Sequence, residues 1–174
     1  MQLAAERGIV VINIAREHND WDELVNHFHG LNNACITVTE EYARSPEFQR
    51  LLSDVPQPKL GVDLVGGRAG LIVAQCLAPD STLVNIGNMS RQPLPLTADV
   101  LLNRNITARG FRLDKWLSEQ PENDRNDFIR RMAKLADAGK TKQLLAWEPF
   151  KDFKLAFNRA QERGERKVVL RMDS

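Results

Sequence analysis

Three glycine-containing segments each follow a short apolar run, at a point where a β-strand is expected to end. They are Asp63–Gly67, Asn85–Met89 and Arg109–Asp114. Glycine has no side chain and tolerates positive φ, so the backbone can approach a ligand closely at such a turn. In an open parallel sheet, ligands collect in the crevice beyond the carboxyl ends of the strands. Taken alone, each segment is better interpreted as an ordinary turn, but at successive strand ends the three together predict a nucleotide-shaped groove.

A basic residue follows the first long apolar run of the chain. The run is Ile9–Ile14, and Arg16 lies just beyond it. In doubly wound nucleotide-binding folds, an acid at the end of the second strand bonds the ribose 2′-hydroxyl, whereas an arginine accommodates a 2′-phosphate. The planar guanidinium suits phosphate because it binds two oxygens at once. Two alternatives stay open: Glu17 takes a ribose hydroxyl instead, or Arg16 is a solvated residue at a strand end.

Other side chains that could do chemistry give weaker patterns. His27 and His29 invite a metal interpretation, but residues two apart on a helix do not face each other. No cysteine or carboxylate stands at zinc spacing, so we expect no metal site. The sequence has no G-x-S-x-G motif, Cys–His pairing or carboxylate dyad, which argues against a hydrolase. The single tyrosine, Tyr42, lies in a polar, helix-like stretch and is interpreted as structural or surface.

Size and charge exclude several classes of protein. A chain of 174 residues is one domain by the usual length and can bury a sound core. The net charge is +1, with Lys and Arg spread along the chain, so nothing indicates a nucleic-acid partner. No apolar run approaches the ~20 residues that cross a bilayer, and no secretory signal is visible, so no membrane partner is expected. Cys35 and Cys76 fit no disulfide framework and are interpreted as buried thiols in a reducing compartment.

Apolar runs and helical patterns alternate along the chain, which predicts an α/β fold with a mainly parallel sheet. The expected strands are 9–14, 35–38, 59–65, 82–86, 106–111 and 167–172. The expected helices are 1–7, 21–28, 46–52, 68–77, 125–138 and 153–161. The helix at 125–138 is the clearest, because its apolar residues form one stripe and Gly139 stops it. That stripe consists of Phe128, Ile129, Met132, Leu135 and Ala136.

The order of several motifs resembles the carboxyl-terminal half of mitochondrial trans-2-enoyl-thioester reductases, in the medium-chain dehydrogenase/reductase superfamily. The resemblance runs through nearly the whole chain. It is carried by Ile12–Arg16, Val38–Glu41, Val55–Lys59, Val65–Gly67, Gly87–Pro93, Arg109–Trp116 and Lys167–Leu170. The most specific part is an Arg-Gly-Phe-x-Leu-x-x-Trp segment that follows a Gly-x-Met-x-x-Gln-Pro segment.

The resemblance implies an NADPH-binding portion of an oxidoreductase. Members of the family have a GroES-like catalytic domain wrapped around a Rossmann domain that binds NADPH. They reduce the 2,3 double bond of enoyl thioesters, carried on CoA or acyl carrier protein, in mitochondrial fatty acid synthesis. The cofactor-binding residues implied for this chain are Arg16, Glu17 and His18 at the adenosine phosphate, Ile86, Gly87, Asn88 and Met89 at the ribose and nicotinamide, Phe111, Arg112, Leu113 and Asp114 beside the carboxamide, and Lys167.

Some of these implied positions depart from the family pattern or allow another interpretation. The family commonly has a second basic residue where His18 stands, and a glycine where Asn88 stands. The first departure weakens the preference for NADPH without cancelling it. Lys167, among other charged residues, is also compatible with a solvated lysine.

The resemblance also implies that part of the fold is missing. The family's proton-donating tyrosine lies in the GroES-like domain, which is not in this chain, so no catalytic residue is assigned. No strand and no G-x-G-x-x-G turn precede the run Ile9–Ile14. In the strand order 3-2-1-4-5-6 that first strand is central, so the first two strands here should lack a neighbour that joins them to the other four. Exposed edges of this kind invite pairing with another chain.

We therefore expect residues 1–174 to form a single, partial Rossmann-type domain of doubly wound, mainly parallel α/β architecture. The isolated chain is expected to be inactive and to bind NADPH poorly. One alternative is a truncated, non-catalytic module that dimerises, for example through the late strands within Thr82–Phe111. Another is a quinone or alkenal reductase of the same superfamily. A homodimer and a mitochondrial location follow from the resemblance alone.

Overall fold

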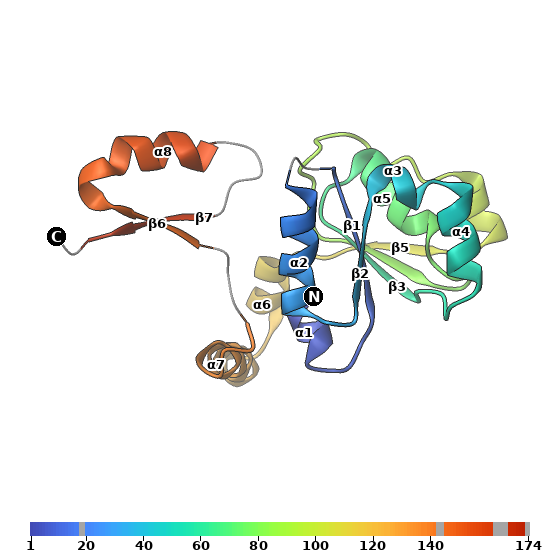
Figure 1. Ribbon diagram of the computed structural model, residues 1–174. Helices are drawn as coiled ribbons and strands as arrows, with labels where there is room; N and C mark the ends of the chain where they lie inside the picture. The colour runs from blue at the N-terminus through green and yellow to red at the C-terminus, as the bar shows by residue number, and fades with distance from the viewer. Residues whose placement is uncertain (18–19, 142–144, 162–166, 173–174) are drawn as a thin grey trace. The chain divides into compact units, whose positions relative to one another are not determined.

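The structure of the chain is a computed structural model, and it describes residues 1–17, 20–141, 145–161 and 167–172. The chain divides into two compact units, Met1–Asp127 and Phe128–Ser174, each with its own packing (Figure 1). All paired strands are parallel, as the alternation of strand and helix patterns predicts. Among the described residues, no helix has both the length and the apolar character needed to cross a bilayer.

The first sheet of unit 1 has two strands, β1 (Val11–Ala15) and β2 (Cys35–Thr39). The short helix α1 (Gln2–Ala5) precedes β1, and α2 (Trp21–Leu31) connects the two strands. The apolar residues of α2 recur at helical spacing and are half-buried, as expected for an amphipathic helix. They are Trp21, Leu24, Val25 and Phe28.

Two short helices follow β2, and side-chain hydroxyl groups cap both. Thr39 accepts a hydrogen bond from the backbone of Tyr42 at the start of α3 (Glu40–Ala43). Ser45 does the same for Phe48 at the start of α4 (Pro46–Ser53), where proline occupies the first turn. These caps satisfy backbone N–H groups that the first helical turn leaves without partners. The ring of Tyr42 packs 5.6 Å from that of Phe48, which agrees with a structural role for the tyrosine.

The second sheet of unit 1 has three strands in the order β3 (Leu60–Asp63), β4 (Thr82–Asn85) and β5 (Thr107–Gly110). The helix α5 (Gly67–Gln75) connects β3 to β4, and a π-helical turn, η1 (Asp99–Asn103), precedes β5. The helix α6 (Leu113–Glu119) follows β5 and was not expected from the sequence, because it is only seven residues long.

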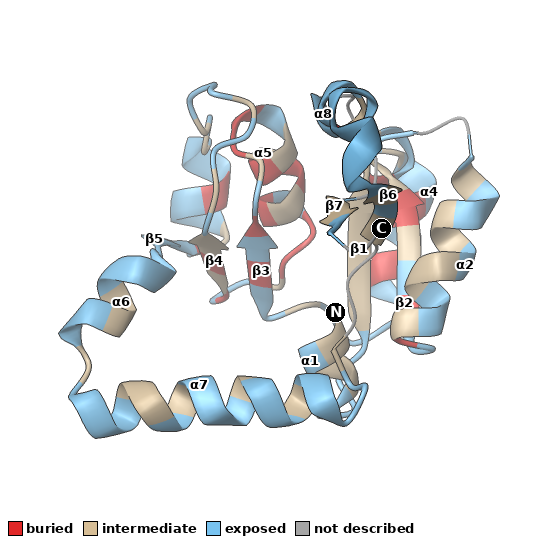
Figure 2. Cartoon of the chain, turned by 90° about the vertical axis from the view of Figure 1, so that its left-hand side faces the viewer, coloured by how far each residue is buried: buried red, intermediate tan, exposed pale blue. Residues whose placement is uncertain are grey.

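Helix α5 contributes to both apolar cores of unit 1, and its buried residues stand out in Figure 2. The core beside β1 and β2 consists of Val38, Ala43, Phe48, Leu52, Ile72 and Cys76. The core beside β3, β4 and β5 consists of Ala74, Leu77, Leu83, Val100 and Ile106. Because Ile72 and Cys76 belong to one core and Ala74 and Leu77 to the other, this helix holds the two sheets in one unit.

The two sheets of unit 1 share no hydrogen-bonded strand pair in the described part of the chain, as the missing central strand predicts. The strand β3 is an edge strand on its side away from β4. Its residues Leu60 and Val62 are 61% and 44% exposed, while Gly61 and Asp63 are buried. A parallel strand is normally covered on both faces and paired on both sides, so these apolar side chains mark an incompletely covered strand.

The helix α7 (Glu122–Asp137) leads into unit 2. Of its predicted stripe, three residues are half-buried, whereas Ile129 and Ala136 are exposed. Gly139 has φ +66° and donates its N–H to the carbonyl of Ala136, which ends the helix as predicted.

Unit 2 contains a strand that sequence analysis did not expect. The strand β6 (Leu145–Pro149) is followed by a 3-10 turn, η2 (Phe150–Asp152), then by α8 (Phe153–Gln161) and β7 (Lys167–Arg171). β6 pairs with β7 in a two-stranded sheet of unit 2, so the partner of the last expected strand is a strand that the sequence did not predict. β6 escaped notice because its run is short and ends in proline, which breaks the usual strand pattern.

Candidate functional site

A buried carboxylate organises the carboxyl ends of β3 and β4. Asp63 is 2% exposed, and its Oδ1 accepts hydrogen bonds from the backbone N–H groups of Val65 and Gly66, each at 2.9 Å. Its Oδ2 accepts a hydrogen bond from Nδ2 of Asn85 at 2.7 Å. The same Nδ2 donates to the carbonyl of Gly87 at 2.9 Å. These hydrogen bonds join the end of β3 to the end of β4 and fix the two strand ends to each other.

The glycine pair after β3 is required by backbone conformation and by close packing. Gly66 and Gly67 have φ of +74° and +56°, which L side chains rarely adopt. A Cβ on Gly67 would lie 3.0 Å from Oγ of Ser90, in the loop that follows β4. The N–H of Ser90 in turn donates to the carbonyl of Val65 at 2.8 Å. The turn after β3 and the loop after β4 therefore pack directly on each other.

Gly87 has a different reason to be glycine than the one expected from the sequence. A Cβ at this position would lie 2.3 Å from the carbonyl oxygen of Leu64, a distance that real Cβ atoms do not reach. The close approach is therefore to the protein's own backbone. Gly87 lets the loop after β4 cross the turn after β3, and in this way it shapes the site.

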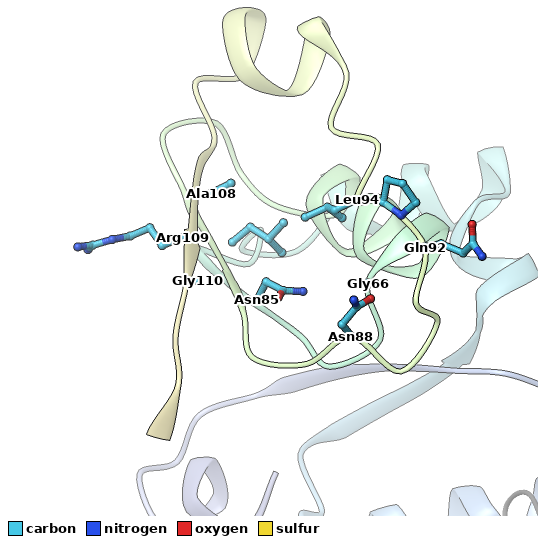
Figure 3. A pocket seen from close by; sticks show the side chains of 10 residues that line it. Gly66, Asn85, Asn88, Gln92, Leu94, Ala108, Arg109 and Gly110 are labelled. Carbon is cyan, nitrogen blue, oxygen red and sulfur yellow. The ribbon is translucent and has the colours of Figure 1, made fainter. Parts of the chain in front are cut away.

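A cavity of about 420 Å³ opens at these strand ends (Figure 3). Its lining comes from β4 and β5 and the loops that follow β3 and β4: Gly66, Leu83, Asn85, Asn88, Gln92, Pro93, Leu94, Ala108, Arg109 and Gly110. We call it the strand-end pocket. Figure 3 shows the amide groups of Asn85 and Asn88 directed toward the pocket, whereas Arg109 extends away from it.

The chemistry of the strand-end pocket is that of neutral hydrogen bonding over an apolar floor. Apart from Arg109, which extends away from it, its polar side chains are carboxamides, which donate and accept hydrogen bonds without titrating. Leucine, proline and alanine supply the apolar surface. No carboxylate, histidine, cysteine or lysine is among its lining residues in the described part of the chain. Such a pocket can orient an amide- or hydroxyl-bearing ligand, but it offers no side chain that exchanges a proton near neutral pH.

The predicted cofactor residues after β4 lie at or beside this pocket. Asn88 lines it, and Gly87 holds the loop in place. Ile86 and Met89 are 44% and 77% exposed, and the N–H of Ile86 donates to the carbonyl of Asp63 at 2.8 Å. Of the four residues, only Asn88 is a lining residue. The other three flank it along the chain.

The predicted residues after β5 are arranged more openly. Phe111 is 40% exposed, and its N–H donates to the carbonyl of Asn85 at 2.9 Å, which extends the β4–β5 pairing by one residue. Leu113 begins α6 and is 49% exposed. Arg112 and Asp114 form a two-pronged ion pair, in which Nε of Arg112 lies 3.2 Å from Oδ1 of Asp114. Hydrogen bonding to the guanidinium lowers the pKa of Asp114 and raises that of Arg112.

The remaining predicted residues are Arg16, Glu17, His18 and Lys167, and none of them is among the described residues that line the strand-end pocket. Arg16 and Glu17 follow β1 and are exposed, but they do not line the pocket. His18 lies outside the described residues. Lys167 is exposed at the first position of β7, in unit 2. A role for these residues in cofactor binding stays a prediction.

Two side chains that join the strand ends, Asp63 and Asn85, were not singled out from the sequence. Asp63 and Asn85 were read only as parts of glycine-containing segments, yet their side chains join the two strand ends. The signal that could have found them is a polar residue at the last position of two adjacent apolar strands. Gln92 and Leu94 also line the pocket, from the loop between β4 and η1.

The cysteines are buried, as predicted. Burial raises the pKa of the Cys76 thiol to about 11, although the charge of Arg104 and a hydrogen bond from Gln49 act in the opposite direction. In the described residues, no three His, Cys, Asp or Glu side chains gather as metal ligands would.

Comparison with known proteins gives consistent relatives. No family model matches the chain. The chain is 36% identical to the mitochondrial enoyl-[acyl-carrier-protein] reductase of Dictyostelium discoideum over 171 residues. This alignment covers 98% of the chain and 49% of that reductase. The chain therefore spans about half the length of the curated relatives it matches.

Solved structures of similar fold include two kinds of reductase. A mutant of Etr1p, the enoyl thioester reductase of Candida tropicalis, in complex with NADP and crotonyl-CoA, superposes with a TM-score of 0.81 at 19% identity, over 97% of this chain and 49% of that one. A quinone oxidoreductase of Pseudomonas syringae superposes with a TM-score of 0.70 at 19% identity, over 97% and 51%. These likenesses confirm the partial Rossmann-type fold.

Proposed function

The chain is related to the mitochondrial enoyl-[acyl-carrier-protein] reductases over almost its whole length and corresponds to about half of theirs, and on this premise we propose that it is the NADPH-binding portion of such an oxidoreductase. The observation that carries the proposal is the strand-end pocket. It lies at the carboxyl ends of three parallel strands, where nucleotide-binding folds hold their ligands. The related Etr1p binds NADP in its solved complex, which supports the choice of cofactor.

The strand-end pocket fits the ribose and nicotinamide end of the cofactor. Its carboxamides can bond ribose hydroxyls and the nicotinamide carboxamide, and Gly66 and Gly110 leave room for close approach of a ring. In this proposal Asn88 contacts the ligand, while Ile86, Gly87 and Met89 shape the loop that carries it. NADPH, when bound, supplies the hydride for reduction, and the protein supplies binding, orientation and electrostatics.

In this proposal the segment after β5 lies beside the carboxamide group of the nicotinamide. Phe111 offers an exposed ring, and Arg112, Leu113 and Asp114 start the helix beside it. The charged residues at the other sites are assigned to phosphate: Arg16 with Glu17 and His18 at the adenosine end, and Lys167 as a further cation. We also propose that residues 1–174 form one partial nucleotide-binding domain, of which units 1 and 2 are both parts.

The substrate class is proposed to be an enoyl thioester carried on CoA or acyl carrier protein. Support comes from the names of the relatives and from the crotonyl-CoA bound to Etr1p. No catalytic residue is assigned to this chain, because the pocket's described lining holds no proton donor near neutral pH. A mitochondrial location is proposed from the same relatives.

Two alternatives have support of their own. The fold likeness to quinone oxidoreductases favours a quinone as a second substrate class. Edge-to-edge pairing of two copies is favoured by β5, which is an edge strand with all four residues exposed. An exposed strand edge is a template for pairing with another chain. A homodimer through β5 would make the chain an assembly module as well as a cofactor-binding one.

Purified chain should bind NADPH weakly and should not reduce crotonyl-CoA. Binding is measured by quenching of protein fluorescence, with Asn88→Ala compared against Asn103→Ala, an exposed amide outside the pocket. We expect the first substitution alone to weaken binding, by about tenfold for one lost ligand hydrogen bond. Equal affinities of the two variants would refute the role of the pocket. Turnover of crotonyl-CoA by this chain would refute the assignment of no catalytic residue.

A further inference from the structure

A second cavity of unit 1, about 560 Å³ in volume, lies beside α5 and shares no lining residue with the strand-end pocket. Helix α5 contributes one face to it, with residues at helical spacing of three and four. The lining consists of Arg68, Leu71, Ile72 and Gln75 from α5, Arg44 and Gln49 from the segment of α3 and α4, and Arg104 after η1. We call it the arginine groove.

The arginine groove concentrates positive charge, with no carboxylate among its described lining residues. Three of its seven lining residues are arginines, and none is acidic. Within the described residues, no carboxylate lies within ion-pair distance of Arg44, Arg68 or Arg104. The whole chain has a net charge of only +1, so this gathering is local and does not reflect a generally basic protein. Unpaired guanidinium groups around a concave surface attract an anion.

Two of the three arginines are held in place by backbone carbonyl groups. Arg104 donates to the carbonyl of Gln75 at 2.7 Å and also to that of Leu77, at the end of α5. Nε of Arg44 donates to the carbonyl of Glu40 at 3.2 Å. A guanidinium has five N–H donors, so each arginine keeps donors for a ligand while its position is fixed. Fixing the side chains beforehand lowers the entropy that ligand binding must overcome.

We propose that the arginine groove binds a small phosphorylated molecule. A phosphoryl group has three peripheral oxygens and about two negative charges, so it can contact several guanidinium groups at once. A carboxylate, by contrast, is satisfied by one arginine. The cavity volume falls within the range of about 300–1,000 Å³ that small-ligand sites occupy. Leu71 and Ile72 give the ligand an apolar surface beside the charged rim.

Calorimetric titration of the whole chain with inorganic pyrophosphate, at constant ionic strength, tests this site. We expect saturable binding that weakens about tenfold in Arg68→Gln and in Arg44→Gln, because each loses charge-assisted hydrogen bonds. Both side chains are exposed, so both variants should keep the wild-type melting temperature. The matched control is Arg50→Gln, an exposed arginine of α4 that pairs with Glu47 outside the groove, and it should bind as wild type does.

Three results would overturn the proposal. The first is the absence of saturable pyrophosphate binding, and the second is equal weakening by all three substitutions. The third is equal affinity for malonate, which would show a general attraction for anions instead of phosphate recognition.

Discussion

The end of β3 and the end of β5 were both predicted to contact a ligand, but they are built in opposite ways. At β3, a buried aspartate and closely packed glycines fix the turn, and α5 follows into the core. At β5, the chain leaves the sheet into an exposed segment held by a surface ion pair between Arg112 and Asp114. Buried, fully bonded polar groups rigidify a structure far more than exposed ion pairs do. The first region is therefore preformed, and the second can adjust to what it binds.

The largest expected effect is at Gly87. In Gly87→Ala the new methyl group meets the carbonyl of Leu64, so we expect a loss of about 3 kcal/mol in the free energy of unfolding. The control is Gly110→Ala, since nothing lies within 4 Å of a Cβ there, and it should change stability by less than about 0.5 kcal/mol. Urea denaturation measures both. Similar losses in the two variants would remove the contrast between the strand ends.

Asp63→Asn should lower the free energy of unfolding by about 2 kcal/mol. The N–H₂ group that replaces Oδ2 of Asp63 cannot accept the hydrogen bond that Nδ2 of Asn85 donates. Asp114→Asn is the matched change at the other strand end. It should leave the melting temperature unchanged, because this ion pair is solvent-exposed. A larger loss at Asp114 than at Asp63, by thermal denaturation, would reverse the account.

The buried thiol of Cys76, at the end of α5, tests the packing beside α5 through the pH dependence of the free energy of unfolding. Its pKa is raised from 9.0 to about 11 in the folded chain, so the native state holds the proton that the unfolded state releases. The stabilisation that the raised pKa of Cys76 gives the folded state is fully present below pH 9 and is lost as the pH rises toward 11. Up to about 3 kcal/mol of the free energy of unfolding should be lost over that interval. Cys76→Ala should show a shallower decline, and parallel declines in the two proteins would contradict the burial.

The smallest effect is the titration of Asp114. Because Arg112 hydrogen-bonds its carboxylate, its pKa lies below the ordinary value, and the ion pair persists until the pH falls through that lowered pKa. Carboxyl chemical shifts in Arg112→Gln should titrate at a higher pH than in the wild type. An unchanged midpoint would mean that the ion pair does not persist in solution.

The sequence predicted local structure well where one pattern dominates. β-Branched and apolar runs marked β1 to β5, and the helix α8 was predicted with its observed bounds, Phe153–Gln161. The short elements α6 and β6 were missed, and β6 forms by pairing with β7, which local propensity does not show. The separation of the two sheets of unit 1 followed from strand order, which is a long-range rule of the fold.

The candidate site was predicted only in outline. Because β3 and β4 are parallel neighbours, the loops that follow them were expected to meet. The hydrogen bond between Asp63 and Asn85 depends on the register of the two strands, which no sequence motif specifies. The pairing of Arg112 with Asp114 was likewise invisible, since residues two apart meet only when the local backbone allows it. The family resemblance supplied candidate positions but not the contacts among them.

The measurement that tests the central claim most directly is nuclear magnetic resonance of the labelled chain during titration with NADPH. Residue-resolved amide shifts detect weak binding and locate it. The account predicts saturable changes at Gly66, Asn88 and Gly110, which line the strand-end pocket. Changes confined to other parts of the chain, or none at millimolar NADPH, would contradict it.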